Sequence, residues 1–192
     1  GFWIQTRIDL IDDEDLALLS KLNVKIDLGV DSFSKTMLEI MRKTRDADGY
    51  LEKFLDLSGK CSRWGIEHDA YLIFNHPGES EETIEEHETF FRTRVSPGLR
   101  GGMLWVRSGA FSLFPGSFVF HHFDAFQEKY GTSVECATWW REERDQLMLS
   151  RSIIPSRDKY GNPFHVTPER IRRPINDFNR SSRRFHLRPT SY

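Results

Sequence analysis

The stretch LIFNHPGES, residues 72–80, decides the fold. An apolar run stops abruptly at a polar turn that contains Pro77-Gly78, and a helical pattern with an acidic start follows it. The stretch IDLGVDSFS, residues 26–34, has the same organisation. Such junctions are typical of the carboxyl ends of strands in parallel α/β proteins, where ligands bind.

Further strands and helices alternate around these two junctions. Hydrophobic periodicity predicts strands at 1–8, 24–30, 66–74 and 102–112, with helices at 14–22, 35–42, 46–64 and 81–94 between them. Asp12 or Asp13 is expected to cap the first helix, and Ser32 or Ser34 the second. The order predicts an α/β fold with a parallel sheet and right-handed crossovers, either a doubly wound sheet or part of an α/β barrel.

The last third of the chain is less regular. Turns are predicted at 96–98 and 114–117, the aromatic segment 118–126 fits no single pattern, and a helix is predicted at 139–152. From Pro155 onward, prolines, asparagines and arginines predict little regular structure beyond a short helix near 168–172.

Charge is unevenly distributed along the 192 residues. The net charge is −2, yet residues 151–192 hold ten Lys and Arg against three Asp and Glu. This basic tail is either a solvated segment or a contact for an acidic partner such as RNA.

Two cysteines, Cys61 and Cys136, are too few and too far apart for a thiolate cluster or a cysteine-based zinc site. No signal peptide and no apolar run long enough to cross a membrane is visible, which indicates a soluble protein of the cytoplasm without a membrane partner. Because the chain opens at Gly1 inside a predicted strand, it is expected to be part of a longer polypeptide, whose N-terminal part would be its partner.

Four short patterns, in this order, resemble those of the radical S-adenosylmethionine (radical SAM) enzymes, in particular the branch with cobalamin-binding members and methylthiotransferases. They are TRID at 6–9, LGVDS at 28–32 followed by MRK at 41–43, IFNHPGES at 73–80, and FPGS at 114–117. The resemblance implies a partial parallel (β/α) barrel over residues 1–120, with an aromatic and then basic extension over 121–192 that is irregular.

The resemblance also implies a chemistry. In this family a [4Fe-4S] cluster cleaves S-adenosylmethionine to a radical that acts on a small-molecule or peptide substrate, and some members also use cobalamin. The cofactor-binding residues of this chain would then include Asp31 and Ser32 toward the polar part of S-adenosylmethionine, and Ile73 and Asn75 toward its adenine. Arg7, Pro77 and Gly78 complete the expected site.

This sequence departs from the family pattern in two ways. It has no three-cysteine cluster motif, so the cluster ligands would lie outside this chain, which alone would be inactive. Asn75 and His76 stand where the family usually has Gly and an apolar residue, so a side chain narrows the expected adenine site.

Each expected site residue also has a structural explanation. Asp31 and Ser32 could cap a helix, Pro77-Gly78 could only shape a turn, and Arg7 could pair with a nearby helix. Arg107 could face a ligand or close a layer of the barrel.

Other residues are weaker candidates for a site. His76 is a possible acid or base, but more often a histidine at such a position is structural. His121 and His122, read as neighbours on a strand, would point to opposite faces and would not share a metal ion. Trp139-Trp140 and the phenylalanines before them could line a substrate cavity or pack in a core. A non-enzymatic α/β module that binds a nucleotide or a protein is the alternative reading of the chain.

Overall fold

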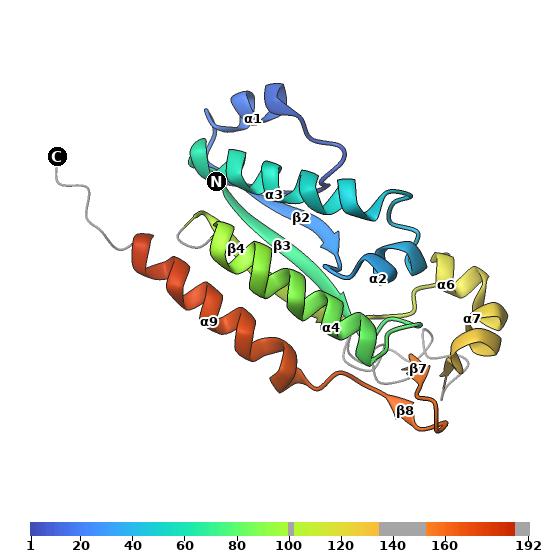
Figure 1. Cartoon of the computed structure of the whole chain (residues 1–192). Coiled ribbons are helices and arrows are strands. Elements are labelled where there is room, and N and C mark those ends of the chain that lie inside the picture. The colour runs from blue at the N-terminus through green and yellow to red at the C-terminus, as the bar shows by residue number, and fades with distance from the viewer. Residues whose placement is uncertain (100–101, 135–152, 187–192) are drawn as a thin grey trace.

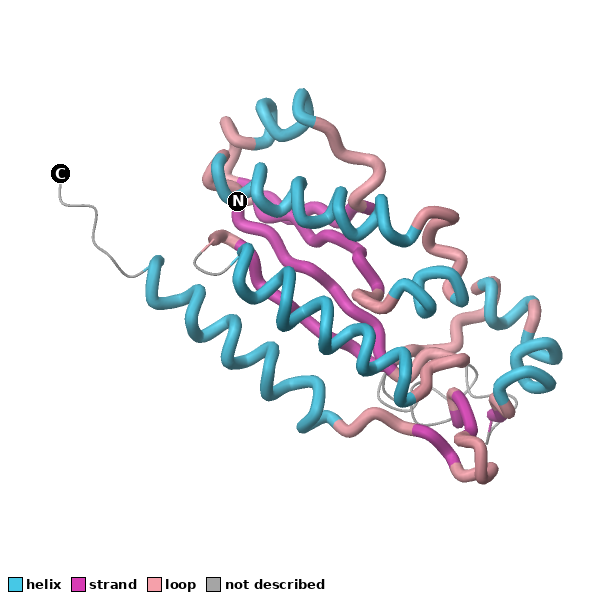
Figure 2. The backbone as a smooth tube through the Cα atoms, in the orientation of Figure 1, coloured by secondary structure: helices cyan, strands magenta, loops and turns pink. Residues whose placement is uncertain are grey.

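A computed structural model describes residues 1–99, 102–134 and 153–186. A four-stranded parallel sheet forms its centre, and the strands follow one another in sequence order across the sheet (Figure 2). The strands are β1 (Phe2–Arg7), β2 (Val24–Asp31), β3 (Glu67–Phe74) and β4 (Leu104–Ala110). This consecutive parallel order confirms the predicted α/β fold and is the arrangement found in a (β/α) barrel.

Helices cover one face of this sheet (Figure 1). They are α1 (Asp13–Leu19), α2 (Lys35–Ile40), α3 (Ala47–Arg63) and α4 (Glu81–Phe90). Alternate side chains of β2 and β3 point into the core beneath the helices; they include the fully buried Ile26, Leu28, Ala70 and Leu72. Burial of these apolar side chains, at about 25 cal/mol per Å², is the main force holding the helices to the sheet.

Polar side chains begin these helices as expected. Asp12 caps α1 and Ser34 caps α2, while Asp46 and Ser80 cap α3 and α4. Their side-chain oxygens accept hydrogen bonds from backbone N–H groups in the first helical turn, which have no partner within the helix.

The opposite face of the sheet is polar at its centre. Asp27 on β2 and Asp69 on β3 lie side by side in register, and both are buried. Lys25 lies 3.1 Å from Asp69, and Arg107 of β4 contacts the same carboxylate. Arg107 therefore belongs to a layer of charges across adjacent strands. Burial raises the pKa of Asp69 although Lys25 opposes the shift.

The helix after β3 does not stop at a turn. It continues from α4 through a π-helical segment, η1 (Phe91–Val95), into α5 (Ser96–Leu99). The predicted turn at 96–98 is therefore wrong. Proline is tolerated in the first turn of a helix, so Pro97 does not prevent α5, although it cannot donate a hydrogen bond to the preceding turn.

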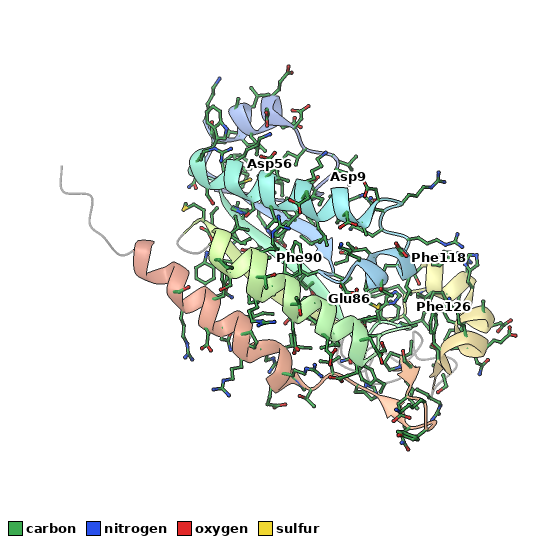
Figure 3. All side chains as sticks on the ribbon, in the orientation of Figure 1. Asp9, Asp56, Glu86, Phe90, Phe118 and Phe126 are labelled. Atoms are coloured by element: carbon green, nitrogen blue, oxygen red, sulfur yellow. The ribbon has the colours of Figure 1, made fainter. Side chains whose placement is uncertain are left out.

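The aromatic segment forms a second, smaller core at the carboxyl end of the sheet. The tight turn at 114–117 is confirmed by a 3.0 Å bond from Ser117 N–H to the Phe114 carbonyl. Two short helices follow, α6 (Phe118–His121) and α7 (Phe123–Tyr130), and Phe118 and Phe126 pack together there (Figure 3). His121 ends α6 and His122 follows it, so the assumption that they lie on a strand was wrong.

The prediction of little structure after Pro155 was also wrong. Two pairs of short antiparallel strands are present. In the first, β5 (Ser133–Val134) pairs with β6 (Ile153–Ile154), and in the second, β7 (Ser156–Arg157) pairs with β8 (Pro163–Phe164). The long helix α9 (Pro168–His186) then runs beside α4 (Figure 1). Its apolar residues Ile175 and Phe178 join the main core, and this packing outweighs the poor helix propensity of its Pro and Asn residues. The helix expected at 139–152 lies outside the described residues.

A side chain of α9 caps the outer edge of the sheet. The Asn179 side chain accepts a hydrogen bond from Val106 N–H (2.9 Å) and donates one to the Val106 carbonyl (2.8 Å). A neighbouring strand would make the same two bonds, so one amide replaces a strand at the middle of β4. In the described parts of the chain, no helix is long and apolar enough to cross a membrane.

Replacing Asn179 with Ala should lower the free energy of unfolding by about 1–3 kcal/mol, because two backbone groups of Val106 lose their partners. Urea denaturation followed by circular dichroism measures the change. Asn176→Ala, an exposed position on the same helix, is the matched control and should change stability little. Equal effects of the two substitutions would show that Asn179 does not hold the edge.

Candidate functional site

The carboxyl ends of β2 and β3 are conformationally unusual. Asp31 has φ 69° and Asn75 has φ 57°, and among the described residues Arg42 is the other non-glycine with positive φ. Asp and Asn are the non-glycine residues that adopt this region most readily, although it still costs roughly 1–2 kcal/mol for a residue with a side chain. Two adjacent strands therefore end in backbone strain, which is a common property of ligand-binding sites.

Asp31 lies in a network of charges. Its carboxylate lies 2.7 Å from Lys43 Nζ and is partly exposed. Arg7 forms a two-bond ion pair with Asp9, with both distances 2.8 Å, and also donates to the Lys43 carbonyl at 3.0 Å. Arg7 therefore pairs with a loop residue, not with a nearby helix, while it anchors the backbone of Lys43.

Ser32 is buried beside this network. Its hydroxyl oxygen accepts a 3.0 Å hydrogen bond from Ser34 N–H, so it shapes the turn, while Ser34 caps α2. Ser34 also donates to Glu86 of α4 at 2.6 Å. The capping function expected of either serine thus belongs to Ser34.

Asn75 forms hydrogen bonds through both its backbone and its side chain. Its N–H donates to the Glu79 carboxylate at 2.5 Å, and its side-chain oxygen accepts from Val166 N–H at 2.8 Å. Glu79 is only 3% exposed, and this burial raises its pKa to about 8 although the hydrogen bond from Asn75 opposes the shift. The side chain at 75 therefore binds the C-terminal extension to the strand end.

The Pro77-Gly78 turn is tightly enclosed. Gly78 has φ 93° and donates to Ser156 Oγ at 2.9 Å, and a Cβ there would lie 3.0–3.1 Å from Ile40 and Tyr130. His76 is buried, and its Nδ1 donates to the Pro77 carbonyl at 2.7 Å. Burial lowers the pKa of His76 to about 4, so the ring is neutral and structural at pH 7.

Ile73 packs at the edge of the second core. It is partly buried against the aromatic residues of α6 and α7 and the segment before them. Asp31 and Ser32 are thus close together at the end of β2, whereas Ile73 and Asn75 lie one strand away and contact the C-terminal extension.

Two residues of this region were not predicted as site residues. Lys43, in the MRK pattern, lies against Asp31, and Glu79 lines a cleft of about 650 Å³ between α2, α4 and α7. The sequence pattern around Lys43 was visible, but its contact with Asp31 depends on the path of the chain between α2 and α3. The burial of Glu79 depends on β7 and α7, which the sequence did not predict.

The described residues offer no metal centre. Among residues 1–99, 102–134 and 153–186, no three His, Cys, Asp or Glu side chains cluster as metal ligands would. Cys61 is buried in the core, and burial raises its thiol pKa to about 12. A thiol of this kind is a poor metal ligand.

No protein-family model and no curated protein matches the chain. Solved structures do match it. The chain is similar to the archaeal Methanocaldococcus infernus Elp3 with an N-terminal deletion (1–46), with 18% identity and a TM-score of 0.51. That match covers 64% of this chain and 27% of Elp3.

A second match is TsrM from Kitasatospora setae, a radical S-adenosylmethionine methyltransferase solved with cobalamin and a [4Fe-4S] cluster bound. The identity is 17% and the TM-score 0.51, over 86% of this chain and 31% of TsrM. The chain has the fold of part of a radical SAM barrel. It spans less than a third of the length of either protein, so the likeness shows the fold alone.

Glu79 should make stability depend on pH. Its pKa is raised in the folded protein, so its contribution is present below the unfolded pKa near 4.5 and is lost as pH rises through about 8. Between pH 6.5 and 8, stability should therefore fall by up to about 1.4 kcal/mol per pH unit, and the slope should level off above pH 8. Glu79→Gln should abolish this slope, measured by urea denaturation at each pH, and a Gln variant with an unchanged slope would refute the assignment.

Gly78→Ala should destabilise the protein more than Gly116→Ala. Both glycines have positive φ, but a Cβ at 116 meets open space. The control should therefore lose about 1–2 kcal/mol for the backbone alone, and Gly78→Ala should lose more because Ile40 and Tyr130 must move. Thermal unfolding of both variants measures the difference, and equal losses would mean that the loop is not enclosed.

Proposed function

We propose that this chain is part of a radical SAM enzyme and supplies one side of the S-adenosylmethionine pocket. The strained end of β2 carries the proposal, because Asp31 leaves the sheet with positive φ and holds a partly exposed carboxylate. The fold likeness to TsrM supports the class of enzyme.

The end of β2 suits the polar part of S-adenosylmethionine. The molecule carries an ammonium, a carboxylate and ribose hydroxyls. Asp31 can accept hydrogen bonds from the ammonium or the ribose, and Lys43 can pair with the carboxylate. Since Arg7 holds the backbone of Lys43, it acts as a positioning residue in this proposal.

The end of β3 suits the adenine less well. The donors of this loop are partly used, because Asn75 N–H bonds to Glu79 and Gly78 N–H bonds to Ser156. The side chain of Ile73 can pack on the purine, and the loop around Asn75, Pro77 and Gly78 would contact its edge through the groups that remain. This loop would exclude water from the adenine ring and keep the ring in position.

Residues outside this chain would hold the [4Fe-4S] cluster. The cysteine content agrees with this, because the chain has two cysteines and Cys61 is buried in the core. When bound, S-adenosylmethionine and a [4Fe-4S] cluster supply the radical chemistry, and this chain supplies orientation and a dry pocket. Cobalamin, present in TsrM, is compatible with the proposal but is not required by the residues at the two strand ends.

Binding of S-adenosylmethionine to the 192-residue chain tests this proposal by titration calorimetry. Asp31→Asn should weaken binding about tenfold or more, because a charge-assisted hydrogen bond is lost, while Asn tolerates the positive φ at 31. Asp56→Asn, at an exposed carboxylate of α3, is the matched control and should bind as the parent does.

Failure of the parent chain to bind S-adenosylmethionine would overturn the proposal and favour a binding module for another ligand. Equal affinity of the parent and Asp31→Asn would remove Asp31 from the pocket. Cleavage of S-adenosylmethionine by this chain alone, under reducing anaerobic conditions, would contradict the placement of the cluster ligands outside it.

A further inference from the structure

A second cavity lies on the helix-covered face of the sheet, beside α9. It has a volume of about 410 Å³, lies between α4, η1 and α9, and is partly open to solvent. Most of its wall is apolar, formed by Phe74, Ile84, Phe91, Ile171, Pro174, Ile175 and Phe178. A mainly apolar space of this size falls in the range of roughly 300–1,000 Å³ that is typical of small-molecule sites.

Polar contacts fix α9 to the fold at two places along the cavity. At one end, Arg170 bonds to Glu88 and Glu81, each at 2.7 Å, and these bonds raise the pKa of Arg170. Farther along α9, Asn179 is fixed to Val106 of β4. The helix is therefore fixed to the rest of the fold on both sides of Pro174 and Ile175, and Phe178 packs on Phe91 of η1 with 5.6 Å between the ring centroids.

Among the polar side chains that line the cavity, one is buried. His87 of α4 lines the cavity and is only 7% exposed. Its Nδ1 accepts a 3.4 Å hydrogen bond from Phe33 N–H, so the neutral ring carries its proton on Nε2. No described residue accepts a hydrogen bond from Nε2. Burial lowers the pKa of His87 to about 4, so the ring is a neutral donor at pH 7.

The charges at the rim do not favour a strongly charged occupant. Arg170 is already paired with two carboxylates, and Arg92 and Asp177 bring opposite charges to the same cavity. The buried part of the wall offers apolar surface and one neutral donor, His87, while Ser96 lines the cavity as a partly exposed residue. An ionised group placed there would lose its hydration without a matching charge.

We propose that this cavity binds an uncharged, mainly apolar small molecule with a carbonyl oxygen, which accepts a hydrogen bond from His87 Nε2–H. The apolar body would lie against Phe91, Ile175 and Phe178. The site has a different lining from the proposed S-adenosylmethionine pocket, although it adjoins the strand ends through Phe33, which bonds to His87, and through Phe74.

Fluorescence titration with 6-propionyl-2-(dimethylamino)naphthalene tests this proposal on the 192-residue chain. This probe has an apolar body and one carbonyl, and its emission shifts to the blue in apolar surroundings. Ile175→Trp should fill the cavity and abolish the shift. Leu22→Trp, at an exposed residue of the segment after α1, is the matched control and should leave the shift unchanged.

His87→Phe separates the hydrogen bond from the packing. It should weaken binding of the carbonyl probe about threefold to tenfold, the effect of one lost hydrogen bond. It should leave the affinity for 2-(dimethylamino)naphthalene, which lacks the carbonyl, unchanged. Circular dichroism checks folding, and Ile171→Trp replaces Ile175→Trp if that variant does not fold.

Three results would overturn the proposal. They are the absence of a blue shift with the parent chain, full binding by a folded cavity-filling variant, and an equal effect of His87→Phe on both probes. Because neither probe resembles S-adenosylmethionine, failure here leaves the proposed function of the strand ends standing.

Discussion

The last strand of a sheet presents backbone N–H and C=O groups that pair with water, with another strand or with a covering element. In this protein the side chain of Asn179 pairs with them at the middle of β4, with one bond to the N–H and one to the carbonyl of Val106. These two bonds fix α9 beside the sheet, and the ion pairs of Arg170 with α4 fix its other end. The main core is thereby completed by residues more than 60 positions away from β4 in sequence.

The strand ends and the helix-covered face of the sheet differ in chemistry. Strand ends at Asp31 and Asn75 combine backbone strain with polar groups, and the C-terminal extension contacts the second of them through Val166. Beneath the helices, the cavity beside α9 is apolar and holds one neutral imidazole. The same C-terminal helix and its approach segment therefore influence both regions, one through a hydrogen bond to Asn75 and one by bracing the cavity.

Local patterns in the sequence were sufficient for the sheet. Strands, caps such as Asp12 and Ser34, and the turn at 114–117 follow from periodicity and from turn chemistry. The resemblance to radical SAM enzymes agrees with the fold of two solved structures. For the site, the sequence indicated which strand ends to examine, but not that Lys43 pairs with Asp31.

What could not be predicted depends on contacts between distant segments. Helix α9 contains Pro174 and several residues of low helix propensity, and it forms because Ile175 and Phe178 reach the core. Likewise, Glu79 is buried by segments 50 to 80 residues further along the chain, including Tyr130 and Ser156 beside Gly78. A local reading of the sequence contains no information on such contacts.

Three buried histidines make the folded protein less stable at acid pH. His68, bonded between Ser58 and the Ile66 carbonyl, joins His76 and His87 as a neutral ring whose pKa is lowered to about 4 by burial. All three would protonate near pH 6.5 in the unfolded chain. Their contribution to the free energy of unfolding is complete above that pH and is lost as pH falls toward 4. Mild acid therefore favours unfolding, because protons bind at three separate sites in the core and at the strand ends.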